Sequence, residues 1–200
     1  IIDPYQLPKI KKQKYTILDI KCIDEQGRKY LVEMQLLEVE AFKNRVIYNV
    51  CKAYSSQLPK GIAYLNLNEV IGITIIDFIL FPELSDRYIT HHKFKEQKSN
   101  ISYFDQIQLY FVELPKFNKE LHELSTLTEK WIYFIKNAGE LEVVPKELKL
   151  EPIVQAFEIA RRSTMTEEEL DEYEERIIAY QDAVGAITAC LLYTSDAADE

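Results

Sequence analysis

The chain has 200 residues, of which 47% are hydrophobic, and its formal net charge at pH 7 is −9. This length and hydrophobic content suffice for one domain with a sizeable core, and only 5 glycines and 7 prolines argue against a disordered chain. No run of about 18 or more uncharged apolar residues occurs, which excludes a membrane-spanning helix.

The charge is spread unevenly along the chain. Residues 1–60 contain 11 Lys and Arg against 7 Asp and Glu, whereas residues 138–200 contain 5 basic against 16 acidic residues. Attraction to phosphate depends on local patches, so the basic first segment is compatible with a DNA partner, and a solvated lead-in explains the same lysines equally well. Cys22, Cys51 and Cys190 lack CxxC spacing, which predicts neither a zinc site nor disulfides and fits a reducing cytoplasm.

Residues 15–37 predict a β-hairpin. The tripeptide 25–27 fits a three-residue loop, in which Gly27 can take the positive φ that the last loop position requires. In that register the numbers of opposed residues sum to 52, so Asp19 lies opposite Glu33.

Alternation along the two predicted strands gives the hairpin one apolar face and one mixed face. The apolar face is predicted to be core and consists of Leu18, Ile20, Cys22, Tyr30, Val32, Met34 and Leu36. The mixed face is apolar at its ends and polar in the middle, with Ile17, Asp19, Lys21, Ile23, Leu31, Glu33, Gln35 and Leu37. In this register Ile17 pairs with Gln35.

The opposed carboxylates of Asp19 and Glu33 indicate a candidate metal site. Like charges directly opposite on a sheet are destabilising by roughly 0.2–1 kcal/mol, and a bound cation reverses that sign. Mg²⁺ typically uses one or two carboxylates with water and substrate phosphate. The alternative is an exposed strand pair whose charges are neutralised by Lys21 and solvent.

Further elements follow in chain order. Apolar residues from Val39 to Leu58 recur at helical spacing and end before Pro59, which predicts a helix packed on the sheet. Strands are predicted at 61–67, 70–81, 88–94 and 101–114, and the Ile-rich second of these is expected to be buried on both faces of a mixed sheet. Helices are predicted at 120–137, 148–162 and 167–186.

Several blocks in order resemble one known family. They are residues 18–35 (LDIKCIDEQGRKYLVEMQ), 42–58 (FKNRVIYNVCKAYSSQL), 111–117 (FVELPKF), 130–134 (KWIYF) and 165–169 (MTEEE). Together they make residues 15–188 similar to the Rpn family of recombination-promoting nucleases and transposases, a branch of the PD-(D/E)xK nuclease superfamily.

The resemblance implies an α/β fold of the restriction-endonuclease type, with a mixed sheet flanked by helices and with C-terminal helices. We expect a lead-in at 1–14, a nuclease-like domain at 15–138 and a helical extension at 139–189. Residues 190–200 resemble a translated sequencing adapter and are expected to be an artefactual tail. By the same resemblance, Rpn-like proteins usually carry a further helical segment before the residues seen here, and that segment is a candidate source of another acidic ligand.

By the same resemblance, Asp19 and Glu33 would hold Mg²⁺ or Mn²⁺, and Gln35 would take the place of the superfamily's usual Lys. The backbone carbonyl of Met34 is a further expected ligand, while the Met34 side chain is expected to point into the core. Gln carries no charge, so Lys21 is a candidate source of the missing cation.

The implied function is metal-dependent cleavage of DNA, associated with recombination or mobile elements. In related nucleases the helix after the catalytic strand borders the cleft, so the candidate DNA contacts are Lys21, Arg45, Tyr48, Lys52 and Gln57. Taken singly, each helical residue is better explained by a solvated helix face. Cutting both strands would favour a homodimer. The alternatives are a catalytically weak DNA-binding or protein-interaction module of the same fold, and an RNA substrate.

Overall fold

The computed structural model describes residues 5–6, 16–17, 20–58, 64–160 and 178. Its contacts divide the chain into two compact units, residues 1–120 and residues 121–200. Within the described ranges, no helix combines the length and the apolar content that crossing a lipid bilayer requires.

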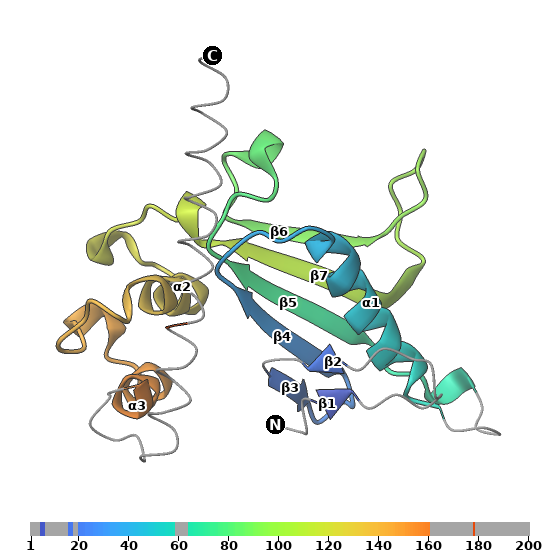
Figure 1. The fold of residues 1–200 in the computed structure, drawn as a ribbon, viewed down its shortest axis with the longest axis horizontal. Coiled ribbons are helices and arrows are strands. Elements are labelled where there is room, and N and C mark those ends of the chain that lie inside the picture. Colours follow the sequence, from blue (N-terminus) through green and yellow to red (C-terminus); the bar gives the residue numbers. More distant parts are fainter. Residues whose placement is uncertain (1–4, 7–15, 18–19, 59–63, 161–177, 179–200) are drawn as a thin grey trace. The chain divides into compact units, whose positions relative to one another are not determined.

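The first unit is built on a mixed five-stranded sheet (Figure 1). Its strands, in spatial order, are β3 (Ile20–Ile23), β4 (Lys29–Gln35), β5 (Val70–Ile76), β7 (Phe104–Glu113) and β6 (Ile89–Phe94). The two outer pairs are antiparallel, and β4–β5 and β5–β7 are parallel. The predicted α/β class with a mixed sheet is therefore confirmed.

The hairpin loop between β3 and β4 forms as the turn chemistry predicts. Gly27 has a φ of 80°, and the amide of Asp24 donates to the carbonyl of Arg28 over 3.1 Å. Ile20 lies opposite Val32, which is the predicted register. A local turn rule was sufficient here because the loop alone sets the pairing of the strands that it joins.

The predicted strand before residue 20 pairs differently. β1 (Tyr5–Gln6) and β2 (Thr16–Ile17) form a separate two-stranded sheet in which Ile17 lies opposite Tyr5. Gln35 pairs with Ile76 of β5. The predicted pairing of Ile17 with Gln35 is therefore wrong, because Ile17 belongs to this second sheet.

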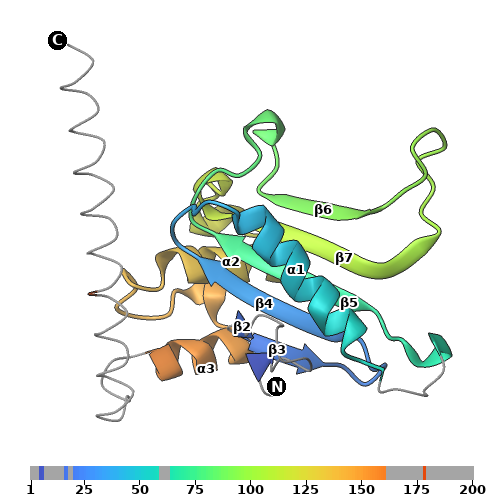
Figure 2. The ribbon, with the colours of Figure 1, turned by 45° about the vertical axis from the view of Figure 1, so that its right-hand side comes forward.

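Helix α1 (Phe42–Ser55) covers one face of the sheet, as both views show (Figures 1 and 2). Its buried Val50 and Ala53 pack against Leu31 of β4 and Val70 of β5. A Cβ atom added to Gly72 would lie 2.9 Å from Cγ2 of Val50, so only a glycine lets the helix approach β5 this closely. The predicted helix after the hairpin is confirmed.

The packing of α1 overturns the predicted core face of the hairpin. Leu31, on the mixed face, is 2% exposed, whereas Ile20 and Met34 on the apolar face are 41% and 48% exposed. The Met34 side chain therefore does not point into a core, contrary to expectation. The helix covers the side that carries Leu31, and strand alternation cannot reveal which side a helix will cover.

The remaining strands largely follow the predicted pattern. β5 is buried or half-buried along its whole length, as expected for a central strand rich in Ile. The predicted strand at 61–67 is wrong over the residues that the structure describes, because Tyr64–Asn66 form a short 3₁₀ turn, η1.

The second unit contains α2 (Leu127–Asn137) and α3 (Glu151–Ala160), with short 3₁₀ turns η4 (Leu121–Glu123) and η5 (Lys146–Leu148). These two helices confirm the predicted C-terminal helices at 120–137 and 148–162, although α2 begins later. Its start is fixed by a capping box, in which the Thr126 side chain accepts from the amide of Glu129 and Glu129 accepts from the amide of Thr126. The predicted helix at 167–186 falls almost entirely outside the described residues.

A buried ion pair lies at the C-terminal end of β7 in the first unit. Glu113 is 0% exposed, and its Oε2 lies 2.8 Å from Nζ of Lys116 in the 3₁₀ turn η3 (Leu114–Lys116). The other oxygen, Oε1, accepts from the amides of Leu80 and Phe81.

Lys116 also binds the loop at residues 80–84, two of whose amides donate to Glu113. Its Nζ also donates to the carbonyls of Phe81 and of Leu84, the last residue of η2 (Pro82–Leu84). Both charges are thus hydrogen-bonded as well as paired, which is the condition under which a buried ion pair is tolerated.

We predict that Lys116→Met lowers the free energy of unfolding by about 3 kcal/mol or more, because Glu113 would remain buried without a counter-charge. Urea denaturation measures this loss. The matched control is Asp86→Asn, which removes the exposed partner of Arg87 and should leave the denaturation midpoint unchanged. Equal midpoints for Lys116→Met and the parent would show that the pair is not needed for stability.

Candidate functional site

Glu33 lies in the middle of β4 on the face that α1 covers. Its side chain is 14% exposed, and its neighbour in the β5 ladder is the buried Thr74. Side chains two residues apart on a strand project to the same face, so Glu33 lies on the side of the sheet where Leu31 meets the helix. The carboxylate is therefore largely shielded from solvent by elements that the apolar core positions.

Arg45, in the first turns of α1, connects Glu33 to Gln35. Its Nη2 lies 2.8 Å from Oε1 of Glu33 and donates to Oε1 of Gln35 over 2.6 Å. The amide nitrogen of Gln35 in turn donates to the carbonyl of Leu37. These contacts fix the Gln35 amide with its oxygen toward the guanidinium, and they place a permanent cation beside the acid.

Asn49 approaches the same carboxylate from one helical turn further along α1. Its Nδ2 is 3.5 Å from Oε2 of Glu33, and the residue is 3% exposed. Two buried side-chain atoms here have no hydrogen-bond partner among the described residues, namely Oδ1 of Asn49 and Nε of Arg45.

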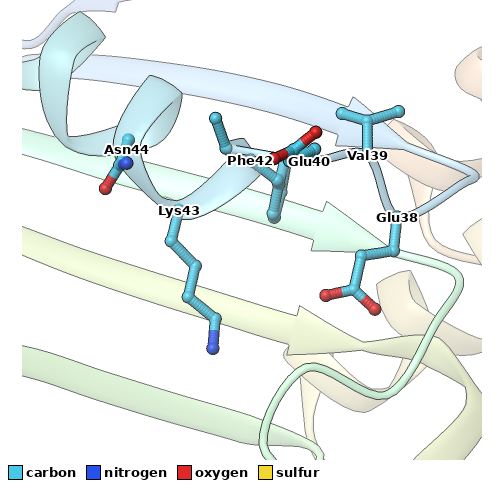
Figure 3. Close-up of a pocket in the computed structure, with 7 residues that line it drawn as sticks. Glu38, Val39, Glu40, Phe42, Lys43 and Asn44 are labelled. Atoms are coloured by element: carbon cyan, nitrogen blue, oxygen red, sulfur yellow. The ribbon is translucent and has the colours of Figure 1, made fainter.

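The loop before α1 orients the helix for these contacts. Ala41, at the helix N-cap, has a φ of 63°, a left-handed conformation that is unusual for a residue other than glycine. Residues 38–44 surround a hollow of about 570 Å³ at this end of the helix. Figure 3 shows the side chains of Glu38, in this loop, and of Lys43, in the first turn of α1, extending in the same direction.

Asp19 lies outside the described residues, so its distance to Glu33 stays a prediction. Within the described part of the chain, no group of three or more His, Cys, Asp or Glu side chains is arranged to hold a metal.

The atoms that gather near Glu33 nevertheless fit a hard cation in kind. The carboxylate, the amide oxygen of Gln35 and the unpartnered Oδ1 of Asn49 are all oxygen donors, which Mg²⁺ and Mn²⁺ prefer. The Met34 backbone belongs to the β4 ladder between Glu33 and Gln35.

The other residues predicted to contact DNA occupy different environments. Lys21 is half-buried opposite Leu31, and Tyr48 is exposed on α1. Lys52 is buried with Nζ 6.0 Å from the centre of the Tyr48 ring, and burial lowers its pKa from the usual value for lysine.

Gln57 joins the end of α1 to the turn before β5. Its side-chain nitrogen donates to the Asn68 carbonyl over 2.8 Å, and its side-chain oxygen accepts from the Asn68 amide over 3.0 Å. In this structure the Gln57 amide therefore supports the fold.

Sequence reasoning missed Asn49. The signal was present, because Asn49 interrupts the apolar stripe between Val46 and Val50 and lies four residues after Arg45. A polar residue on the buried stripe of a helix indicates a polar group opposite it.

Comparison with known families gives a match over most of the chain. Residues 1–189 match the PD-(D/E)XK nuclease family transposases. Searches of curated proteins and of solved structures found no match. The match covers most of the chain, and it agrees with the mixed sheet, the flanking helix and the resemblance seen in the sequence blocks. The chain belongs to the PD-(D/E)XK nuclease family transposases.

Proposed function

We propose that this chain is a Mg²⁺- or Mn²⁺-dependent DNA endonuclease associated with recombination or mobile elements. Family membership implies phosphodiester chemistry on DNA, and divalent metals are typical of the family. The observation that carries the proposal is Glu33, a shielded carboxylate with Gln35 two residues along the strand and the cation of Arg45 in contact with both.

In the proposed site Asp19 and Glu33 hold the cation, with the backbone carbonyl of Met34 as a further ligand. A divalent ion there would lower the pKa of a water molecule and neutralise charge on the scissile phosphate. The Gln35 amide, anchored by the Leu37 carbonyl, orients the attacking water.

Arg45 supplies the positive charge that the superfamily's Lys would bring. Its Nη2 lies 2.6 Å from the side-chain oxygen of Gln35. Arg45 would therefore contribute the positive charge, and Gln35 the hydrogen bonding, that one lysine contributes in the superfamily. Lys21, the earlier candidate, has no contact of this kind among the described residues. A fixed cation near the phosphate stabilises charge that develops in the transition state.

DNA would approach over α1 and the β3–β4 hairpin. Tyr48 offers an exposed ring on α1, and the half-buried Lys21 of the hairpin is a further candidate contact. Lys52 is buried and the Gln57 side chain is hydrogen-bonded to Asn68, so these two residues are the weaker candidates. Residues 1–60, which contain the hairpin and α1, carry more basic than acidic side chains. This excess of positive charge supports attraction of the DNA phosphates to these elements. Cleavage of both strands would use a homodimer, and a cytoplasmic location fits the isolated cysteines.

The second candidate is a DNA-binding or protein-interaction module that retains the fold with little or no catalysis. One observation favours it, namely that Arg45 already contacts the Glu33 carboxylate that a metal would require. Such a module would bind DNA without divalent metal.

We predict that the protein nicks supercoiled plasmid in Mg²⁺ or Mn²⁺, and that Asp19→Ala and Glu33→Ala each abolish nicking, because each removes a carboxylate from the proposed cation site. Gel electrophoresis with and without chelator measures the conversion of supercoiled to open-circular DNA. The matched control is Glu38→Ala, an exposed acid in the following loop, which should cut like the parent.

Plasmid binding in chelator without nicking in either metal would favour the second candidate. Full cleavage by both Asp19→Ala and Glu33→Ala would remove these residues from the mechanism.

We also predict that Arg45→Met lowers the nicking rate by on the order of 10²-fold, the size expected when one charge-stabilising donor is lost. Adding Gln35→Lys to Arg45→Met should restore part of the rate, because the new lysine returns a cation to the same place. Single-turnover nicking rates measure both effects, with Lys43→Met as the control on the same helix. A double variant that folds but is no faster than Arg45→Met would show that Arg45 does not replace the lysine.

A further inference from the structure

Asn49 is a polar side chain in a place where an apolar one would pack. It lies between Val46 and Val50 on the buried stripe of α1, and it is 3% exposed. Its amide nitrogen reaches Oε2 of Glu33 only at 3.5 Å, the limit of a hydrogen bond. Its oxygen, Oδ1, is buried and has no partner among the described residues.

An unpartnered buried oxygen is unfavourable, and native proteins rarely retain one without a reason. Removing a polar group from water without a new hydrogen bond opposes folding, and a leucine, which has the same branched shape, would avoid this penalty. Such atoms are commonly explained by a bound ion, by a bound water molecule or by a functional role of the residue. Nδ2, not Oδ1, is the atom that faces Glu33, and both are bonded to the same carbon. A rotation of the Asn49 amide that exchanges the two atoms would bring Oδ1 beside that carboxylate, where its missing partner would lie.

The chemistry of the neighbouring atoms selects among these partners. A hydrogen-bond donor would suit Oδ1, and Arg45 has an unused buried Nε–H, yet the two atoms do not bond to each other. A divalent cation accepts electron pairs from amide and carboxylate oxygens alike. Arg45 contacts only Oε1 of Glu33, so the other oxygen, Oε2, is the one that a cation beside Asn49 would use.

We propose that Asn49 is a further ligand of the divalent cation held by Glu33, through its amide oxygen Oδ1. This inference rests on the proposed metal-dependent function. It adds a ligand from α1 to a set that otherwise comes from the hairpin strands. Metal binding would therefore tie the helix to the sheet, so the metal should strengthen the packing of α1 as well as supply the chemistry.

The test compares Asn49→Leu and Asn49→Asp with the parent. Titration calorimetry with Mn²⁺ gives the affinity, and thermal unfolding in chelator gives the metal-free stability. Asn44→Leu is the matched control, because Asn44 is an exposed asparagine on the same helix.

We expect Asn49→Leu to weaken Mn²⁺ binding at least tenfold while its unfolding midpoint in chelator equals or exceeds that of the parent. Asn49→Asp should bind Mn²⁺ at least as tightly as the parent, with a lower midpoint in chelator that Mn²⁺ restores. Asn49→Leu removes a metal ligand and also the buried oxygen that has no hydrogen-bond partner. Asn49→Asp adds a buried negative charge, which is stabilised only when the cation is bound.

Two results would overturn this inference and leave the proposed function intact. In the first, Asn49→Leu binds Mn²⁺ like the parent while Glu33→Gln loses binding. In the second, Asn49→Leu lowers the unfolding midpoint in chelator without changing the affinity for Mn²⁺, as expected if Asn49 only holds a structural water. If the parent binds no Mn²⁺, or Glu33→Gln binds it unchanged, the proposed metal site fails as well.

Discussion

The environment of Glu33 depends on the packing of α1 against one face of the sheet. Leu31 and Val70 receive Val50 and Ala53 of the helix, and the absence of a side chain at Gly72 allows the close approach. Burial of each large apolar side chain contributes roughly 1.5–3 kcal/mol, so this contact holds the helix firmly. The same contact carries the polar residues of α1 to the acid of β4.

The polar contacts around Glu33 form a chain that starts at its carboxylate and ends on the backbone. Arg45 joins the acid to Gln35, and Gln35 is anchored by the Leu37 carbonyl. In a shielded site such fixed groups have little freedom to reorganise, which is the condition under which charge stabilisation is effective. If Gln35 takes the place of the superfamily's lysine, as we propose, Arg45 still provides a positive charge beside the acid.

Local rules predicted much of the fold. The loop at 25–27 set the register from Ile20 to Ile23, the Ile-rich run identified β5, and helical spacing identified α1. The features that the sequence did not predict depend on contacts between residues far apart in the chain. Both faces of the hairpin carry apolar residues, so the sequence could not tell which one the helix covers. Asn49 escaped notice because its significance depends on a contact with a residue 16 positions earlier. The pairing of Asp19 with Glu33 stays a prediction.

The Glu113–Lys116 pair gives a loop some of the properties of secondary structure. The amides of Leu80 and Phe81 belong to neither a helix nor a strand, yet both donate to a carboxylate that is inaccessible to water. Their protons can exchange with deuterium only when this end of the sheet opens. On the hydrogen-exchange timescale the loop therefore behaves as part of the β-sheet's cooperative unit, although its backbone has no ladder partner there.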